Sequence, residues 1–402
     1  MKAEDIWLVA VTAGRWQIHG ICEAKALGFK ILAIDADSDA EGFSYSDYTL
    51  NMSFDDHSAI VNAIKGLNLN IRGAVSFCSE VGMALAATIR EAFNLPGIRS
   101  NICKRLLDKG VQREIWGDKK IPGPDWKVFD NPITAFSGAS QFSIPFIIKP
   151  TDSSGSRGVT KIESVEDLHE AIDRAFYYSR SGKVIIESYM DGTEFTVEVF
   201  VIKGKVNVLA VTEKKKVEGT RGTVASELAT PDRPEEVIAA IKNTVVNAFI
   251  ALDYFEGPGH AEIILMKNGN VGLVEVAGRG GGFMVFDRFV PTVSGVNIAK
   301  LTALQSVGSE VEIVDLYESA AVLRFFPSKP GIVDGIHGFE KANLIKGVEA
   351  SSFVKVGDRL QKATADGDRL GYVLSNAATP SEARQLADQA ERLVYFDINS
   401  EQ

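Results

Sequence analysis

The sequence predicts a mixed α/β and α+β protein that begins with a parallel-sheet domain. Apolar runs alternate with helical stretches over roughly the first hundred residues, which is typical of strand–helix–strand units. Further along, the apolar runs come in hairpins, and the last part combines strands with one helix. The 402 residues exceed what a single hydrophobic core usually organises, so we expect several domains.

The first part of the chain has the pattern of a small doubly wound domain. Its apolar runs cover residues 6–11, 29–34 and 71–77, and helical stretches near 17–27 and 57–65 separate them. Asp35 and Asp37 follow the second run, where a dinucleotide fold carries an acidic residue, but the first loop offers only Gly14 and lacks G-x-G-x-x-G. We therefore do not predict NAD binding and expect this domain to supply one wall of a site.

The central part changes to strands joined by hairpins. The expected strands are 145–149, 184–187, 195–202, 260–266 and 271–276, and the expected helices are 165–178 and 234–251. Lys267-Asn268-Gly269-Asn270 joins the last two strands, and Asn-Gly between apolar runs is a strong hairpin signal. Beyond about residue 310, a small α+β domain is predicted by strands at 320–326, 349–355 and 371–375 and a helix at 380–393.

Composition argues against several classes of function. The net charge is −10, without the basic surplus that a nucleic-acid binder needs for phosphate contacts. No stretch approaches the roughly 20 apolar residues that span a bilayer, and the start of the chain fits a strand better than a signal peptide. Cys22, Cys78 and Cys103 lack metal-ligand spacing, so we expect reduced, mostly buried thiols. We predict a cytoplasmic protein with no nucleic-acid or membrane partner.

A lysine followed by a loop of small residues predicts a phosphate site. In PFIIKPTDSSGSRGV (145–159), a strand delivers Lys149 and the loop follows it. The small residues of the loop are Ser153, Ser154, Gly155, Ser156 and Gly158. They let backbone N–H groups approach phosphate oxygens, and Lys149 adds a charge. The order of a Walker A loop is absent, and a plain hairpin turn is the alternative.

The next segment, 184–199, predicts a site for a planar base and a sugar. An apolar strand ends in Glu187, and the chain turns at Asp191-Gly192. Such a connecting strand can offer backbone groups to a base while apolar side chains enclose the ring. Glu194, seven residues after Glu187, could accept from two ribose hydroxyls. The alternative is an edge strand with solvated acids, since exposed glutamate is common.

A third segment carries two acids and an arginine. Glu262 and Glu275 lie on the two strands of the expected hairpin, where antiparallel pairing can bring them face to face. Facing carboxylates repel unless they share a proton or a cation, and hard oxygen ligands suit Mg²⁺. Arg279 follows in a glycine-rich loop, from which it can reach a developing anion. The alternative is a glycine-rich turn beside two solvated acids.

In their order along the chain, these segments resemble the ATP-grasp superfamily, above all the branch with L-amino-acid (dipeptide) ligases, biotin carboxylase and the carbamoyl-phosphate synthase large-chain repeats. The resemblance implies an ATP-grasp fold with three domains. They are an N-terminal Rossmann-like domain at 1–104, an ATP-grasp domain at 105–310 with a small lid at about 115–190, and a C-terminal α+β domain at 311–402.

The resemblance also implies roles for single residues. Lys109 and Lys149 match the two ATP-contacting lysines, and the loop 153–158 matches the mobile flap over the phosphates. The residues that match the adenine hinge are Glu187, Tyr189 and Met190, and Glu194 matches the ribose carboxylate. The matches to the Mg²⁺ ligands are Glu262 and Glu275, and Arg279 matches the arginine that stabilises the acyl phosphate or tetrahedral intermediate. Where the family commonly has Glu-x-Asn-x-Arg, this chain has Ala277 in place of the asparagine, which leaves the number and geometry of metal ions open.

The function implied by the resemblance is an ADP-forming ligase that joins a small carboxylate, such as an amino acid, to an amine through an acyl phosphate. ATP and Mg²⁺, with Mn²⁺ as an alternative metal, would be the cofactors, and Lys149 and Arg279 the catalytic residues. A carboxylase or carbamoyl-phosphate type of enzyme that uses bicarbonate is one alternative, and a non-catalytic ATP-binding protein is the other. A homodimer is common among relatives, but the sequence does not fix the oligomeric state.

Further side chains near the expected cleft are candidates for substrate contact. The polar candidates are Lys214–Lys216, Arg221, Glu227, His260 and Arg324, and the apolar candidates are Phe283, Met284, Phe286 and Phe325. A lysine run is more often a solvated loop, and core packing is the commoner role of apolar side chains.

Overall fold

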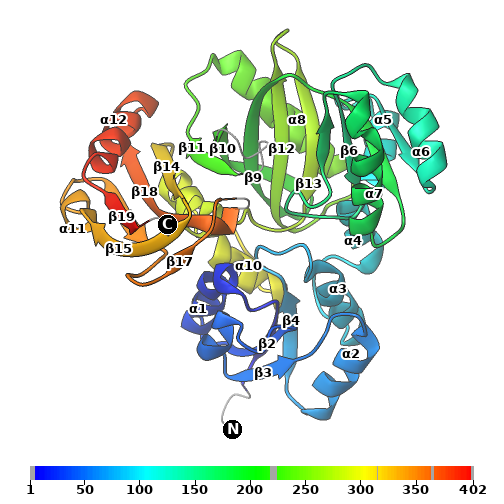
Figure 1. Cartoon of the computed structure of the whole chain (residues 1–402). Helices are drawn as coiled ribbons and strands as arrows, with labels where there is room; N and C mark the ends of the chain where they lie inside the picture. Colours follow the sequence, from blue (N-terminus) through cyan, green and yellow to red (C-terminus); the bar gives the residue numbers. More distant parts are fainter. Residues whose placement is uncertain (1–4, 218–223, 315, 364–365, 400–402) are drawn as a thin grey trace.

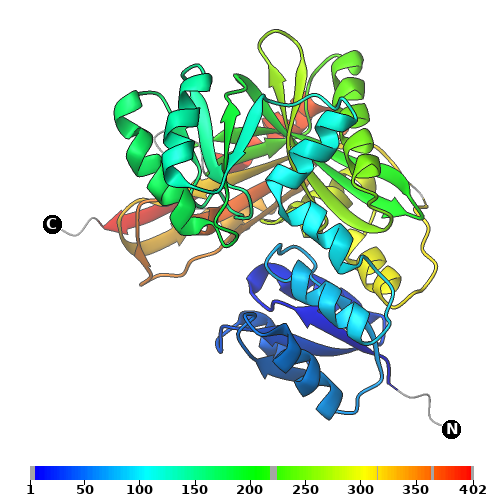
Figure 2. The same ribbon diagram turned by 90° about the vertical axis from the view of Figure 1, so that its right-hand side faces the viewer.

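The structure is a computed structural model that describes residues 5–217, 224–314, 316–363 and 366–399. Figures 1 and 2 show an N-terminal part below a large central sheet. A smaller sheet with its helices lies at one end of the large sheet, and the C-terminal part lies at the other (Figure 1). Parallel strands in the first part and antiparallel strands elsewhere confirm the predicted fold class.

Four parallel strands form the N-terminal sheet, in the order β3-β2-β1-β4. The strands are β1 (Trp7–Val11), β2 (Lys30–Asp35), β3 (Tyr48–Asn51) and β4 (Ile71–Val75). The helices are η1 (Arg15–Gln17), α1 (Ile18–Ala26), η2 (Glu41–Tyr45), α2 (His57–Gly66) and α3 (Met83–Ala92). Because the strands are parallel, their carboxyl ends meet at one edge, and Phe77 N–H after β4 donates to Gln17 Oε1 after β1 at 3.0 Å.

Two helices lead from this sheet to a four-stranded antiparallel sheet of order β5-β8-β6-β7. They are α4 (Ser100–Leu107) and α5 (Lys109–Asp118). Asp108 caps α5 by accepting from Gly110 N–H at 2.8 Å, which fixes Lys109 at the first helical position. The strands are β5 (Trp126–Phe129), β6 (Phe146–Pro150), β7 (Thr160–Ile162) and β8 (Val184–Ser188). The helices of this part are α6 (Pro132–Gly138), η3 (Ala139–Gln141), η4 (Val165–Asp167) and α7 (Leu168–Tyr178).

The largest sheet is antiparallel and runs in the order β13-β12-β9-β10-β11-β14-β18-β16. Its first five strands along the chain are β9 (Gly192–Ile202), β10 (Lys205–Lys216), β11 (Ala225–Ala229), β12 (Gly257–Met266) and β13 (Val271–Ala277). The other three are β14 (Ala320–Pro327), β16 (Val348–Ser352) and β18 (Arg369–Ala377). The accompanying helices are α8 (Glu235–Ala251), η5 (Val285–Phe289), α9 (Val290–Ser294) and α10 (Ile298–Ser306). Because β11 pairs with β14, one sheet crosses the expected boundary at residue 310, and the two domain boundaries, at residues 104 and 310, stay predictions.

The C-terminal part adds a three-stranded sheet of order β17-β15-β19. Its strands are β15 (Gly331–His337), β17 (Arg359–Leu360) and β19 (Tyr395–Asn399), and its helices are α11 (Phe339–Ala342), η6 (Asp366–Asp368) and α12 (Pro380–Glu391). Thr379 and Glu382 form a capping box that begins α12, and this helix packs on β14 and β18. The C-terminal part is thereby anchored on the large sheet.

Among the described residues, no helix is long and apolar enough to cross a membrane. The three cysteines are free thiols. Cys103 is buried as expected, Cys78 is half-buried and Cys22 is exposed, so the expectation of burial is wrong for Cys22.

Candidate functional site

A lysine and an arginine share one buried glutamate at the junction of α5 and the smaller sheet. Lys149 Nζ on β6 lies 2.6 Å from Glu187 Oε2 on β8, and Arg113 on α5 donates from Nε to Glu187 Oε1 at 2.8 Å. The three side chains are at most 6% exposed. Arg113 also donates to the carbonyl oxygens of Leu273 and Val274 on β13. The cluster therefore ties the smaller sheet to α5 and to the large sheet.

The charges in this cluster shift the pKa values of their neighbours. Burial would raise the pKa of Glu187, but Arg113 and Lys149 outweigh burial and lower it to about 2. Burial lowers the pKa of Lys149, and Glu187 opposes that effect. The Glu187 carboxylate is thus paired with two cations. The role of Glu187 at an adenine hinge stays a prediction, in which its backbone groups would contact the base.

Lys109 connects the expected flap with the end of the large sheet. Its Nζ lies 3.0 Å from Glu275 Oε2 on β13 and donates to the carbonyl oxygen of Ser153 at 2.8 Å. Burial would lower the pKa of Lys109, but the carboxylates of Glu275 and Glu80 outweigh burial and raise it. Lys109 therefore keeps its charge in a place where a phosphate could replace a carboxylate as its partner.

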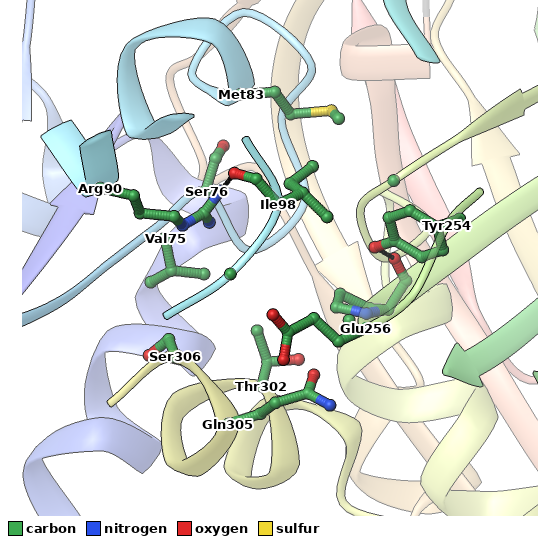
Figure 3. Close-up of a pocket in the computed structure, with 14 residues that line it drawn as sticks. Val75, Ser76, Met83, Arg90, Ile98, Tyr254, Glu256, Thr302, Gln305 and Ser306 are labelled. Carbon is green, nitrogen blue, oxygen red and sulfur yellow. Dashed lines mark hydrogen bonds between the residues drawn. The ribbon is translucent and has the colours of Figure 1, made fainter. Parts of the chain in front are cut away.

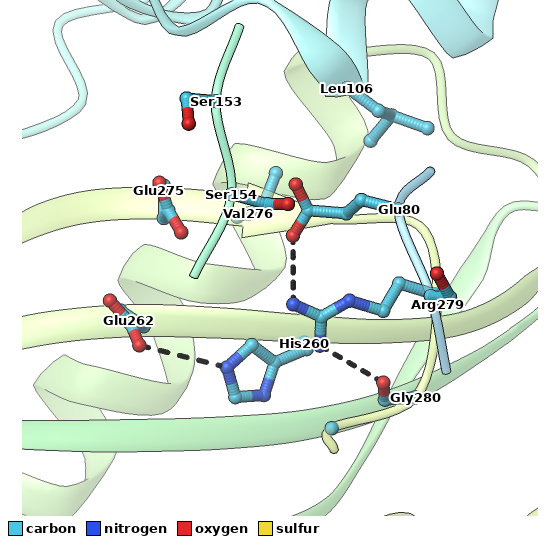
Figure 4. A network of polar contacts seen from close by, with 12 residues as sticks. Glu80, Leu106, Ser153, Ser154, His260, Glu262, Glu275, Val276, Arg279 and Gly280 are labelled. Carbon is cyan, nitrogen blue, oxygen red and sulfur yellow. Dashed lines mark hydrogen bonds and ion pairs between the residues drawn. The ribbon is translucent and has the colours of Figure 1, made fainter. Parts of the chain in front are cut away.

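The two predicted metal-binding acids face each other. Glu262 on β12 and Glu275 on β13 are direct partners across the antiparallel pair, so their side chains lie on the same face of the sheet. Figure 4 shows the two carboxylates together near the strand end that leads to Arg279. Burial would raise the pKa of Glu262, but Lys214 and His260 outweigh burial and hold it well below its usual range. The predicted juxtaposition of the two acids is confirmed by this register.

A histidine and a further acid support the carboxylate pair. His260 contacts Glu198 on β9 through Nδ1, and its Nε2 lies 4.0 Å from Glu262 Oε1. Burial would lower the pKa of His260, but Glu198 and Glu262 outweigh burial and raise it to about 9. His260 is the direct partner of Ala277 across the strand pair. The position where the family commonly has a metal-binding asparagine therefore holds a small side chain opposite a charged imidazole.

Arg279 is paired with an acid that the sequence analysis missed. Its Nη2 lies 2.8 Å from Glu80 Oε1, and its Nη1 donates to the Gly280 carbonyl oxygen (Figure 4). Glu80 comes from the loop after β4, and Phe77 in the same loop accepts from Gly280 N–H at 3.0 Å. The available signal was an acid just after the third apolar run, at the sheet edge where parallel α/β sheets bind ligands.

Glutamate 194 lies between two lysines of β10. Lys214 and Lys216 both contact the Glu194 carboxylate, and Lys214 Nζ is also 3.3 Å from Glu262 Oε1. Lys215 points to the opposite face of the strand and lies 2.8 Å from Glu227 Oε1. The predicted lysine run is therefore part of a strand rather than a loop, and two of its three side chains reach the acids of the site.

The expected hinge residues contact neighbouring strands, and the expected flap forms a tight loop. Lys161 Nζ lies 4.3 Å from the centre of the Tyr189 ring. Met190 packs over Gly272 on β13 so closely that a Cβ added to Gly272 would lie 2.3 Å from the Met190 sulfur. The flap turns through left-handed backbone at Gly155, Ser156 and Gly158, with φ of 64°, 58° and 76°. The positive φ of Ser156 is uncommon for a residue with a side chain and marks a tight loop.

Two family descriptions match this chain. Residues 142–287 match the ATP-grasp domain, and residues 324–399 match the L-amino acid ligase C-terminal domain 2. The first stretch includes Lys149, the expected hinge residues, the Glu262–Glu275 pair and Arg279. The chain contains an ATP-grasp domain. The predicted superfamily is confirmed by this match.

Individual proteins agree with this assignment. The chain is 24% identical to y4rH of Sinorhizobium fredii over 341 residues, which is 83% of this chain and 70% of y4rH. It is 27% identical to a D-alanine–D-alanine ligase of Flavobacterium johnsoniae over 191 residues, which is 45% of this chain and 52% of the ligase. The crystal structure of an L-amino acid ligase from Bacillus licheniformis superposes with a TM-score of 0.85 at 21% identity and covers both chains completely. The similar proteins of stated activity include D-alanine–D-alanine ligases and an L-amino acid ligase, in agreement with the predicted enzyme class, and a biotin carboxylase from Campylobacter jejuni is among the similar structures.

The carboxylate pair of the ATP-grasp domain suits a cation shared with phosphate. Among the described residues, no group of three or more acidic, histidine or cysteine side chains is arranged to hold a metal ion. Glu262 and Glu275 offer hard oxygens, and Mg²⁺ typically takes one or two carboxylates together with substrate phosphates and water. Glu198 and Glu262 raise the pKa of His260 to about 9, which favours the charged imidazole, whereas a metal ligand must be the neutral form. The donor set therefore fits Mg²⁺ or Mn²⁺ only when phosphate oxygens complete it.

Most other substrate candidates lie in packed positions. Glu227 contacts Arg324 and Arg384 at 2.6 Å, and Arg324 also contacts Asp388 and Glu391 on α12. The Arg324 candidate is thus an anchor for α12. The apolar candidates Met284, Phe286 and Phe325 are buried in one core cluster, against which Phe283 packs. Arg221 lies outside the described residues.

Figure 3 shows a small cavity that is lined by residues of the N-terminal part and of the central part of the chain. Its volume is about 40 Å³, and its lining includes Ser76, Arg90, Tyr254, Glu256 and Gly278. This volume holds a few water molecules but not a substrate, since ligand pockets measure roughly 300 Å³ or more. Ser76 and Gly278 belong to the two loops that carry Glu80 and Arg279, so the cavity lies next to their attachment.

Proposed function

We propose that the protein is an ATP-dependent carboxylate–amine ligase. It would join an amino acid or another small carboxylate to an amine, with release of ADP and phosphate. The observation that carries this proposal is that Glu262 and Glu275 face each other, with Lys109 Nζ 3.0 Å from Glu275 Oε2 and Arg279 in the same network of polar contacts (Figure 4). Basic groups for phosphate, acids for a metal and an arginine for a developing anion are the parts that phosphoryl and acyl transfer need.

Lys109 and Lys149 would hold the phosphates of ATP. Both lysines lie in a water-poor setting, where a charge acts more strongly than in water. The loop 153–158 would cover the phosphates, and its link to Lys109 through the Ser153 carbonyl couples the two. Glu194 would accept from the ribose hydroxyls, while Tyr189 and Met190 would flank the base.

Glu262 and Glu275 would hold Mg²⁺ or Mn²⁺, which when bound neutralises phosphate charge. A substrate carboxylate oxygen would attack the γ-phosphorus, and the bond to the ADP oxygen would break. The closed flap would exclude water from the resulting acyl phosphate. An amine would then attack the carbonyl carbon, with Arg279 facing the oxyanion, and phosphate would leave as the amine loses its proton.

The experiment is ADP release from MgATP, measured with amino acids supplied singly and in pairs, and with bicarbonate and ammonia in separate wells. We expect release that requires both a carboxylate and an amine, with an amide or peptide product by mass spectrometry. Release that needs bicarbonate would favour the carboxylase or carbamoyl-phosphate alternative. Binding of MgATP without ADP release in any well would favour the non-catalytic alternative, for which Ala277 is the supporting feature.

The remaining expectations about this enzyme concern its setting. The cytoplasmic location, the homodimer and the division at residues 104 and 310 stay predictions. Light scattering of the purified protein would decide between a monomer and a dimer.

A further inference from the structure

The flap, residues 153–158, begins at a segment that is tied to two other stretches of the chain. Thr151 and Asp152 lead into the flap from the end of β6. Thr151 is fully buried, and its N–H donates to the Lys183 carbonyl oxygen at 3.2 Å. The Thr151 carbonyl oxygen accepts from the backbone N–H of Lys109 at 2.8 Å. The start of the flap is therefore fixed to the lysine that is expected at the phosphates.

The Asp152 carboxylate holds the turn that follows α7. Its Oδ2 accepts from Ser181 N–H at 2.7 Å, and its Oδ1 accepts from Arg180 N–H and from the Ser179 hydroxyl, each at 3.2 Å. These three donors are the hydrogen-bond partners of the carboxylate within the described part of the chain. Hydrogen bonds to an ionised acceptor are stronger than those between neutral groups, so Asp152 is a firm attachment point.

The far end of the flap is fixed by packing. Gly158 is buried, and its φ of 76° lies in the left-handed region that favours glycine. A Cβ added to Gly158 would lie 2.9 Å from Pro150 Cγ and 3.0 Å from Tyr178 Cβ. Pro150 ends β6 and Tyr178 ends α7, which are the two elements that Asp152 connects. Both ends of the flap are thus attached to the same pair of elements.

Between these ends the flap makes few contacts. Its middle residues, Gly155, Ser156 and Arg157, are exposed. Within the described part of the chain, the flap beyond Ser153 forms hydrogen bonds only with itself and with Val159. A segment with few buried contacts opens at a small cost in free energy, and loop positions at its ends absorb the change of backbone angles. The flap can therefore move about two fixed ends.

Among the described residues, a single hydrogen bond leads from the flap to the site. Lys109 Nζ donates to the carbonyl oxygen of Ser153 at 2.8 Å and lies 3.0 Å from Glu275 Oε2. Figure 4 shows Ser153 and Ser154 together with the network that contains Glu275. The flap thus starts beside the carboxylate pair, and its direction from there depends on how Asp152 is held.

We propose that Asp152 is a positioning residue, which fixes the first end of the flap so that the flap closes completely over the acyl phosphate. This inference rests on the proposed ligase function and deepens it by naming the residue that protects the intermediate from water. Under a closed flap the amine attacks the carbonyl carbon and phosphate leaves. Under an open flap water attacks the same carbon, phosphate leaves, and the substrate carboxylate forms again with loss of a proton. One ATP is then consumed without a product.

Loss of the attachment should change the fate of the intermediate more than the binding of ATP. The Asp152 carboxylate contacts none of the residues that are proposed to hold ATP or the metal ion. The bond between Lys109 N–H and the Thr151 carbonyl oxygen involves backbone atoms, so a change of the Asp152 side chain leaves both of its partners in place. A merely structural role of Asp152 would lower all activities together.

The first test measures ADP and amide product together, with a substrate pair that supports turnover. We expect the wild-type protein to release about one ADP for each amide bond. In Asp152→Asn an amide group replaces a carboxylate oxygen before a backbone N–H, so the ADP released per amide should rise about tenfold while the KM for ATP changes less than about threefold. The matched control is Asp173→Asn, which changes an exposed aspartate on α7 and should keep the wild-type ratio.

The second test follows the flap itself and needs no turnover. Arg157 in the exposed middle of the flap offers a cleavage site to trypsin. Mg²⁺ and a non-hydrolysable ATP analogue should slow cleavage after Arg157 by roughly fivefold or more in the wild-type protein and in Asp173→Asn, because cleavage follows the population of the open flap. In Asp152→Asn the slowing should fall below about twofold. Mass spectrometry of the fragments identifies the bond that is cut.

Three results would overturn the inference. They are an unchanged ADP-to-amide ratio in folded Asp152→Asn, unchanged protection of its Arg157, and a wild-type protein in which the nucleotide does not slow cleavage after Arg157. If Asp152→Asn does not fold, Ser179→Ala removes one of the three donors and should shift both measurements in the same direction by a smaller factor, and no shift would reject the inference. If the wild-type protein releases no ADP with any substrate pair, the ligase proposal fails separately, and the protection of Arg157 decides the role of Asp152.

Discussion

Two kinds of acid flank the large sheet, and their surroundings differ. Glu262 and Glu275 keep 25% and 24% of their side chains exposed, while Glu187 and Glu227 keep 4% each. Glu187 is held by Lys149 and Arg113, and Glu227 by Lys215, Arg324 and Arg384. Acids that are sealed and surrounded by cations fasten one part of the chain to another. Acids that keep about a quarter of their side chain exposed are available for a ligand, so exposure, rather than the number of neighbouring cations, separates the two kinds.

The largest effect should come from neutralising a reachable acid. Glu275→Gln removes a charge proposed to hold the metal, so we expect kcat/KM for MgATP-dependent ligation to fall roughly 10²-fold or more. The melting temperature should change little, because Glu275 is not sealed in a cluster. The comparison is made by coupled ADP assay and calorimetry, with Glu349→Gln on β16 as the control acid. Unchanged turnover in Glu275→Gln would remove this residue from the site.

A sealed acid should give the opposite result. Glu187→Gln leaves two buried cations without their carboxylate, and breaking a buried pair in this way costs about 3 to 5 kcal/mol. Urea unfolding should show that loss in the free energy of unfolding. Any loss of activity should follow from misplacement of Lys149, and it should therefore appear in the KM for ATP. A fully stable variant would show that the cluster does not fasten the smaller sheet.

The pH dependence of stability sharpens the same contrast. Glu187 has a pKa of about 2 in the folded protein against an ordinary value of 4.5, so the unfolded chain binds more protons between these values. The stabilisation is complete above about pH 4.5 and is lost as the pH falls toward 2. This contribution of Glu187 to the free energy of unfolding is on the order of 3 kcal/mol. Unfolding midpoints measured across this range should fall more steeply for the wild-type protein than for Glu187→Gln, and parallel curves would contradict the assignment.

The predictability of these features follows from how local their causes are. The strand that delivers Lys149 and the hairpin that carries Glu262 and Glu275 have signals within a few residues, and the structure has them at the expected places. The exposed edge strand β3 and the terminal strand β19 lack apolar runs, so no local sequence pattern predicted them.

Features that depend on contacts between residues far apart in the sequence could not be predicted from the sequence. Glu80 meets Arg279 only because the loop after β4 docks on the glycine-rich loop. Arg324 was taken as a possible substrate contact, yet it joins Glu227 because β11 pairs with β14. A single sequence does not encode either pairing in a readable local pattern.

The smallest effects should separate two neighbouring lysines of β10. Lys214 lies between Glu194 and Glu262, so Lys214→Met should raise the KM for ATP by about tenfold, the value of one charge-assisted hydrogen bond. Lys215 on the other face is 55% exposed, and Glu227 retains two arginines without it. Lys215→Met should therefore leave the KM unchanged and alter the free energy of unfolding by less than about 1 kcal/mol. Because the two substitutions are chemically identical and adjacent, equal effects on the KM would mean that the face of the strand does not decide which lysine serves the site.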